Sequence, residues 1–263
     1  MNNFRAFLGK ELMENLRTKR LLVMLCVFLF FAISSPLLAR YMGELFALLL
    51  PGEDEMSQSL LAIMGEPVWM DSYGQLYANL GQLGALTVLL LYMGSILREK
   101  RDGSADLVFT KGLGSGAFVL AKFTVAGALT LGVTLASVLV GYIYTLLLFG
   151  YGGNIIDVLL GGLAFGAFLL MLLAVTLLCS AVAKSTAVSA VLGLSVFFLL
   201  IFISALPRIG RFSPGNLLAS GPFEITLGHS PDGFAVMMAI TIAITVISLW
   251  AAAGITAKKS FTK

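Results

Sequence analysis

Long apolar segments alternate with shorter polar ones along this chain of 263 residues. A helix needs about 20 predominantly apolar residues to cross a bilayer, and six segments have a suitable length. They cover residues 21–39, 80–97, 118–148, 155–182, 186–206 and 233–257. No polar segment between them is long enough to build a soluble domain. The pattern therefore predicts an all-α integral membrane protein with six transmembrane helices.

The composition agrees with this prediction, since 59% of the residues are hydrophobic and only 12% are charged. Two polar connections are longer than the others. Residues 40–77 carry several aromatic side chains that resemble an interfacial aromatic belt, namely Tyr41, Trp69, Tyr73 and Tyr77. Residues 207–232 are rich in Pro and Gly, and we expect a short re-entrant helix at about 216–220.

Small residues four positions apart occur within three of the spans. Such pairs let two membrane helices approach closely. The pairs are Gly81 with Ala85, Ala128 with Gly132, and Gly162 with Gly166. We expect each pair to lie at a helix–helix contact.

Residues 2–20 form an amphipathic segment before the first span. Apolar residues recur there at helical spacing, which predicts a helix lying along the membrane surface. Glu11 is an exception, because it follows Phe4 by seven residues and so returns to the apolar face. Its carboxylate either snorkels to the lipid headgroups or faces the charged loop after the second span, or a partner protein.

Residues 98–122 form a charged island between the second and third spans. Ser104 can cap a helix here, Asp106 then lies in the first turn, and Gly112 stops the helix after about two turns. Three consecutive apolar residues, 107–109, lie inside it. Helices shorter than about 12 residues are marginal in water, so this one needs a surface to dock on. That surface belongs either to a partner protein or to this chain's own membrane domain.

This loop resembles the first cytosolic loop of the ABC-2-type transporter permeases. Their motif has an acidic residue, then Gly-Thr-Leu-Glu, some apolar residues, a turn, Ser-Arg, and a lysine in the next span. The matching positions here hold Glu99, Gly103, Ser104, Asp106, Leu107 and Lys122. Two positions depart from the motif, since Gly112 replaces the usual proline and Ser115 the usual arginine. Residues 10–12, Lys-Glu-Leu, followed by Arg17, are also similar to the family's N-terminal segment.

The resemblance implies the transmembrane domain of an ABC-2 (type V) exporter, with residues 1–20 as a cytosolic interface helix and 21–263 as the membrane domain. It implies a permease subunit that moves a substrate across the cell membrane. The polar residues within the spans are uncharged, which suits an amphipathic or apolar substrate better than an ion. A separate ATPase would bind ATP and Mg²⁺, so this chain would be neither an enzyme nor a cofactor-binding subunit. Two permeases, identical or a related pair, would assemble with two ATPase copies in membrane lipid. Neither a metal nor a nucleic acid is expected.

The resemblance also implies roles for individual residues. A coupling helix at about 103–112 and the short turn before the fifth span would contact the ATPase through Glu99, Gly103, Asp106, Leu107, Phe109, Lys111 and Lys184. The interface helix would act through Glu11 and Arg17. The second and fifth spans would face the partner permease and line the route, through polar residues such as Asn79, Gln82, Ser189 and Ser195.

The basic residues predict the orientation. Of the 17 Lys and Arg residues, only Arg40, Arg208 and Arg211 fall on one side of the predicted spans. Basic residues collect on the cytosolic side of membrane proteins. Both termini and the loop of residues 98–122 are therefore expected in the cytosol.

Several other kinds of chemistry lack the residues they need. His229 is the only histidine, which excludes a zinc protease of the H-E-x-x-H kind, and no G-x-x-x-x-G-K-[ST] phosphate loop is present. Cys26 and Cys179 both lie inside apolar segments without metal-ligand spacing. No span has a charged residue near its centre, which disfavours ion-coupled transport. A secondary carrier and a non-transporting membrane scaffold or sensor remain the alternatives.

Overall fold

The computed structural model describes residues 2–49, 66–110, 112–206 and 209–260. In these ranges the chain is helical, with six helices long and apolar enough to cross a membrane. These spans are Arg20–Leu45, Trp69–Arg101, Ser115–Phe149, Ile155–Val182, Thr186–Ser204 and Phe234–Ala257. The predicted all-α fold with six spans is confirmed.

The helices follow one another in a simple order. Helices α1 and α2 precede residues 50–65, and the second span is assembled from α4, a π-helical turn η1, α5 and α6. Their bounds are Asn2–Arg17 for α1, Arg20–Leu49 for α2, Trp69–Asn79 for α4, Leu80–Gly84 for η1, Ala85–Tyr92 for α5 and Ser95–Arg101 for α6. The remaining elements are α7 (Ser104–Thr110), α8 (Ser115–Phe149), α9 (Ile155–Val182), α10 (Thr186–Ser204), η2 (Gly210–Phe212), η3 (Pro214–Leu218), α11 (Ser220–Thr226) and α12 (Phe234–Ser260).

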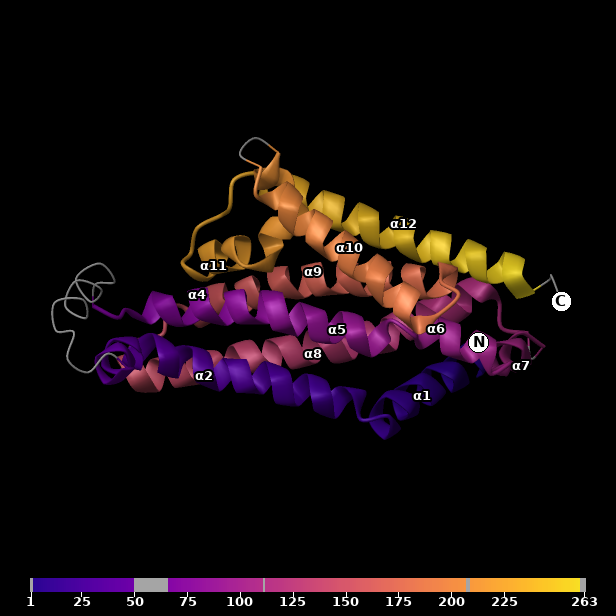
Figure 1. Ribbon diagram of the computed structural model, residues 1–263, viewed down its shortest axis with the longest axis horizontal. Coiled ribbons are helices and arrows are strands. Elements are labelled where there is room, and N and C mark those ends of the chain that lie inside the picture. Colours follow the sequence, from indigo (N-terminus) through magenta and orange to yellow (C-terminus); the bar gives the residue numbers. More distant parts are fainter. Residues whose placement is uncertain (1, 50–65, 111, 207–208, 261–263) are drawn as a thin grey trace.

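The spans form an elongated bundle around α9. In the most apolar window of α9, 72% of residues are buried, against 17% in that of α12 and 22% in that of α10. Helix α9 packs on α8, α12, α10, α11 and α5. Figure 1 shows both termini and α7 at one end of the bundle, called the α7 end below, and α11 at the other, called the α11 end. The outer faces of α2, α10 and α12 are left for lipid or a partner.

The second span begins earlier than its apolar segment does. Residues 69–79 are helical, and Asp71 accepts a hydrogen bond from the backbone N–H of Val68 just before the first turn. Tyr73 and Tyr77 are fully buried, so the prediction that they belong to an interfacial belt is wrong. Their hydroxyls find partners inside the bundle: Tyr73 donates to the Gly152 carbonyl at 2.8 Å, and the Tyr77 hydroxyl lies 3.1 Å from Thr226 Oγ1.

Not all of the small-residue pairs lie at helix–helix contacts. Gly162 and Gly166 of α9 face side chains of α8, and a Cβ at Gly166 would lie 2.5 Å from Leu131 Cδ1. Ala128 and Gly132 are instead exposed on α8, so that prediction is wrong. The spacing marks a narrow helix face but does not say whether a neighbour covers it. The short helix expected near 216–220 is present as η3, and α11 follows it.

Candidate functional site: a buried charge network beside helix α7

Helix α1 lies against the α7 end of the third span. The Phe7 ring is 5.4 Å from that of Phe118 on α8, and both side chains are buried. On its other side α1 exposes Leu12, Met13 and Leu16. A helix with one face on protein and an exposed apolar face is suited to lying in the membrane interface. The predicted helix is therefore present, and it ends at Arg17 rather than at residue 20, while its place in the membrane interface stays a prediction.

A buried lysine joins α1 to the second and third spans. Lys122 of α8 places its Nζ 2.9 Å from Glu11 Oε1 and 3.0 Å from Glu99 Oε1 of α6. The side chains of Lys122 and Glu11 are 1% and 2% exposed. Glu11 therefore does not snorkel to the headgroups. It faces the loop region instead, as one of the two predicted alternatives had it.

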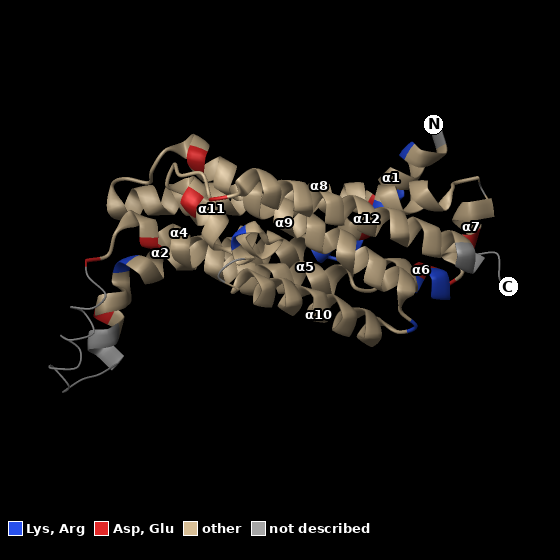
Figure 2. Ribbon diagram, turned by 90° about the horizontal axis from the view of Figure 1, so that it is seen from above, with Lys and Arg blue, Asp and Glu red and all other residues tan. Residues whose placement is uncertain are grey.

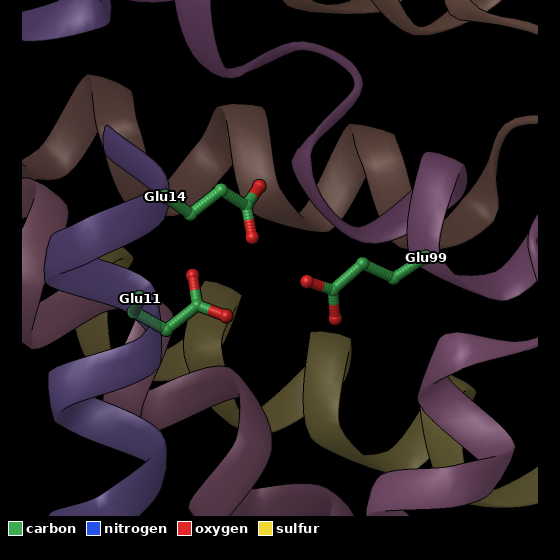
Figure 3. A group of neighbouring side chains, drawn as sticks. All are labelled: Glu11, Glu14 and Glu99. Atoms are coloured by element: carbon green, nitrogen blue, oxygen red, sulfur yellow. The ribbon is translucent and has the colours of Figure 1, made fainter. Parts of the chain in front are cut away.

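Two further basic groups complete a charge network of Lys10, Glu11, Glu14, Arg20, Glu99 and Lys122. The Lys10 ammonium lies 3.1 Å from Glu11 Oε1 and 3.0 Å from Glu14 Oε2, and it also pairs with Glu99. Arg20 Nη2 is 3.7 Å from Glu14 Oε1. Figure 3 shows the carboxylates of Glu11 and Glu14 on α1 turned toward that of Glu99. Three acids and three bases balance one another, as burial of charge requires.

The network shifts the pKa values of its outer members. Burial disfavours the charged form of Lys10, but the hydrogen bond to Glu99 and the charges of Glu11 and Glu99 outweigh it and raise the pKa of Lys10. Burial likewise opposes ionisation of Glu14, yet the charges of Lys122 and Lys10 and the hydrogen bond from Lys10 lower its pKa. Both groups are therefore held in their charged forms.

The three carboxylates alone have the spacing of a metal site. One oxygen from each lies within 4.8 Å of the other two. However, the Lys10 ammonium lies within ion-pair distance of all three, and Lys122 contacts two of them. The chain's own lysines thus supply the positive charge that a metal ion would bring, and the arrangement is an ion cluster that fastens helices together.

The network extends to α5 through Asn15. The Asn15 amide donates to the Glu11 carbonyl at 2.9 Å and accepts from the Tyr92 hydroxyl at 3.1 Å. The Arg20 guanidinium lies over the Tyr92 ring, 5.6 Å from its centroid. These contacts attach α1 to the last residue of α5, next to the point where the second span is interrupted.

The interruption separates α5 from α6 at Met93 and Gly94. Gly94 leaves the helical conformation, with φ −107° and ψ 7°. The freed backbone N–H groups of Ile96 and Leu97 both donate to Ser180 Oγ of α9, at 3.1 Å each. Buried donors need such partners. Ser180 therefore holds the start of α6 against the central helix.

Helix α7 follows α6 after a glycine turn. Gly103 and Gly112 bound it with φ values of 71° and 85°, which favour glycine. Asp106 lies in the first turn, as predicted. Ser104 is the first residue of the helix rather than its cap, and its hydroxyl donates to the Glu99 carbonyl at 3.3 Å. This bond connects α7 to the residue that enters the charge network.

Helix α7 has one covered face and one open face. Ala105 is buried, and the Phe109 ring lies 5.4 Å from that of Phe118. Leu107 is 66% exposed, and Asp106 is exposed beside it. The fold-back alternative thus describes one face of α7, while Leu107 and Asp106 are exposed on the other face. Helix α7 itself lies at one end of the bundle (Figure 1).

The turn before the fifth span lies beside this region. Arg101 of α6 donates to the Lys184 carbonyl at 2.9 Å, and the Lys184 side chain is exposed. Arg17 is also exposed, at the last turn of α1. Figure 2 shows blue and red segments of α1 and α6 at this end. Lys111 lies outside the described residues.

The predicted route residues are not all alike. Asn79 donates to Ser35 Oγ of α2 at 3.1 Å, so it joins two helices. Ser189 is buried, and its hydroxyl has no hydrogen-bond partner in the described chain. Ser195 is exposed and bonds only to the Val191 carbonyl of its own helix. Gln82 is exposed in the π-helical turn η1 and forms no hydrogen bond with the residues that the structure describes.

Sequence reasoning missed several members of the site. Lys10 and Lys122 entered only through the family motif, and Glu14, Asn15, Arg20, Tyr92 and Ser180 were not singled out. Their partners are far away in sequence; Asn15 and Tyr92, for example, are 77 positions apart. The one usable signal was an acid on the apolar face of a helix, which pointed to Glu11.

Six helices long and apolar enough to span a bilayer define a multi-pass membrane protein. A sequence model described as ABC-2 family transporter protein matches residues 5–211. The chain belongs to this family, whose members are membrane components of ABC transporters. None of the curated proteins matches the chain. The matched part contains the interface helix, the charge network, α7 and the first five spans.

Proposed function

We propose that this chain is the permease subunit of an ABC exporter and that α7 is its coupling helix. The observation that supports the proposal is the division of α7 into two faces. One face packs on Phe118 through Phe109, and the other exposes Leu107 and Asp106. An exposed leucine on a short helix at the tip of a membrane domain suits a groove on a soluble partner. That partner would be a separate ATPase carrying ATP and Mg²⁺.

The charge network would transmit movement from α7 into the membrane. A displacement of α7 would move Glu99 of α6, to which Ser104 is hydrogen-bonded. Lys122 of α8, which pairs with both Glu99 and Glu11, would then move α8 and α1 as well. Because the helices at this end are joined by buried ion pairs, they move together rather than separately. A nucleotide can change the spans only if the contacts differ between two states of the complex. The break at Gly94, bridged by Ser180, is the place where α6 can change its angle to α5.

Residues 1–20 would thus form an interface unit and 21–263 the membrane domain. The basic residues of α1, α6 and the termini support a cytosolic α7 end, with both termini inside. Residues such as Arg17 and Lys184 would lie beside the ATPase.

The route would pass the exposed side chains of Gln82 in η1 and Ser195 in α10. An unbonded amide in hydrocarbon is costly, and Gln82 is therefore better placed against a second permease or a water-filled path. π-helical turns also occur often at functional sites. Ser195 exposes a hydroxyl on α10, which contacts α5. Neutral polar groups among apolar ones suit an amphipathic or apolar substrate. Two permeases, identical or related, and two ATPase copies complete the proposed assembly.

The test separates the two faces of α7. The permease is purified from its native membranes, and a captured ATPase is identified by its Walker motif. Leu107→Ala should weaken this capture without changing the melting temperature of the permease, because Leu107 is exposed. Phe109→Ala should lower the melting temperature even without a partner, since Phe109 packs on Phe118.

Leu147 near the far end of α8 is 73% exposed and supplies a matched control, and Leu147→Ala should change neither property. If Leu107→Ala lowers the melting temperature and leaves capture intact, the coupling-helix assignment is wrong. If the permease works with no ATPase at all, a secondary carrier or a scaffold becomes the better description.

A further inference from the structure

A second site lies at the α11 end, far from the charge network. A cavity of about 350 Å³ opens between α9, α11 and α12. Its polar lining comes from Asp157, His229 and Ser230, and its apolar lining includes Leu160, Leu163 and Met238. The cavity is therefore amphipathic, unlike the groove between α2 and α5, whose lining is almost entirely apolar.

The two kinds of lining are ordered along the membrane normal. Asp157 lies in the first turn of α9, at the end of the span. Leu163 is six residues further along, or about 9 Å deeper at 1.5 Å per residue. Met238 is likewise one turn inside α12. Polar groups at the mouth and apolar groups toward the bilayer centre repeat the order found in a phospholipid.

The mouth of the cavity carries the Asp157 carboxylate, in the first turn of α9, where the helix dipole favours a negative charge. In the described chain the half-buried Asp157 carboxylate forms no hydrogen bond or ion pair, and no Lys or Arg lines the cavity. Gly228, with φ +80°, faces it, and a Cβ there would lie 3.6 Å from Asp157 Oδ2. The absence of a side chain at Gly228 leaves space beside the carboxylate. A cationic group of a ligand is the complement of this arrangement.

We propose that this cavity binds the headgroup of a phospholipid that carries a primary ammonium group, as ethanolamine phospholipids do. The ammonium pairs with Asp157, and the neighbouring phosphate accepts hydrogen bonds from Ser230 and from the His229 imidazole. The volume holds a headgroup but not whole acyl chains. The chains run along Leu160 and Leu163, which are 47% and 42% exposed. This proposal does not depend on the coupling role of α7.

The experiment uses the purified full-length chain and defined lipids. Dioleoyl phosphatidylethanolamine, phosphatidylcholine and phosphatidylglycerol are added separately, and lipid-bound protein is counted by native mass spectrometry. A partly exposed ion pair gives about three- to five-fold in affinity, so the ethanolamine lipid should bind that much more tightly than phosphatidylglycerol, which has no cationic group. Phosphatidylcholine should bind with intermediate affinity, because its quaternary ammonium is charged but bulky and has no N–H group to donate to Asp157. Asp157→Asn should abolish the preference. Glu224→Gln, at an exposed acid of α11 outside the cavity lining, should leave it unchanged.

A second variant tests the apolar part of the site. Met238→Trp fills the deep end and should weaken binding of the ethanolamine and choline lipids alike. Melting temperatures of all variants identify any that are misfolded, and either Asp157→Asn or Met238→Trp suffices for the test. The proposal is overturned if the three lipids bind equally, if Asp157→Asn keeps the preference, or if Glu224→Gln loses it to the same extent. In the last case, the preference for the ethanolamine lipid would come from the negative charge of the surface rather than from binding in this cavity.

Discussion

Replacing Lys122 by methionine should destabilise the permease more than any other single change in the charge network. Methionine keeps the length of the side chain but removes the ammonium that lies 2.9 Å from Glu11 and 3.0 Å from Glu99. Each pair represents about 6 kcal/mol of attraction at an effective dielectric constant of about 20, before desolvation is subtracted. Removing one partner of a buried ion pair costs about 3–5 kcal/mol, because the other charge stays buried.

This cost corresponds to a fall in melting temperature on the order of 10 °C. The assay is thermal unfolding of the purified permease in detergent. Lys10→Met is the matched control, because the Lys10 side chain is 43% exposed and Lys122 still neutralises both acids; its cost should stay below about 1 kcal/mol. Adding Glu11→Gln to Lys122→Met should recover part of the loss. Equal effects of the two lysine changes would refute the argument.

Three other predictions follow from the same structure. Ser180→Ala should uncouple ATP turnover from transport by freeing the Ile96 and Leu97 N–H groups, whereas Thr176→Val, one turn away on α9 and bonded only to its own helix, should not. Glu14→Gln should flatten the acid limb of the stability profile, measured as melting temperature against pH. The folded pKa of Glu14 lies below its ordinary value of 4.5, so its contribution is present above that value and is lost as the pH falls through the folded pKa. With Cys26 and Cys179 replaced, an impermeant thiol reagent should label a cysteine at Ser220 in intact cells but not one at Asp102; the reverse result would contradict the orientation.

The structure decides which positions can accept a single cysteine for this labelling experiment. A Cβ at Gly215, on the side expected to face outward, would lie 2.4 Å from the Leu200 carbonyl oxygen. Gly103 has open space but a positive φ, which strains any other residue. Ser220 and Asp102 are exposed and accept a cysteine without either problem.

The six spans could be predicted from the sequence because a long apolar segment has few alternatives to crossing a bilayer. The start of the second span could not be predicted, because tyrosines such as Tyr73 and Tyr77 next to an apolar segment are typical of the membrane interface. Only the fold reveals that the Gly152 carbonyl and Thr226 satisfy their hydroxyls inside the bundle.

The candidate site was predictable in part for a similar reason. An acid on an apolar helix face signals that Glu11 has a special environment, and the family motif points to Glu99 and Lys122. Nothing in the local sequence tells that these three meet, because the contact of Glu11 with Lys122 joins residues 111 positions apart. The two faces of α7 were likewise hidden, since Leu107 and Phe109 have similar hydrophobicity and differ only in what lies beside them.

The long distance in sequence between Glu11 and Lys122 has a consequence for the insertion of the newly synthesised chain into the membrane. The acids of α1 leave the ribosome long before Lys122, so the nascent chain carries Glu11 with only Lys10 of its own helix as a partner until the third span has been inserted. Lys122 in turn can pair only with Glu99 of α6 until α1 closes over it. The ion pair between Glu11 and Lys122 therefore forms only after the first three spans have been inserted. A chain that inserts any of these spans wrongly keeps Glu11 and Lys122 apart, and the buried pair that attaches α1 to α8 is not formed.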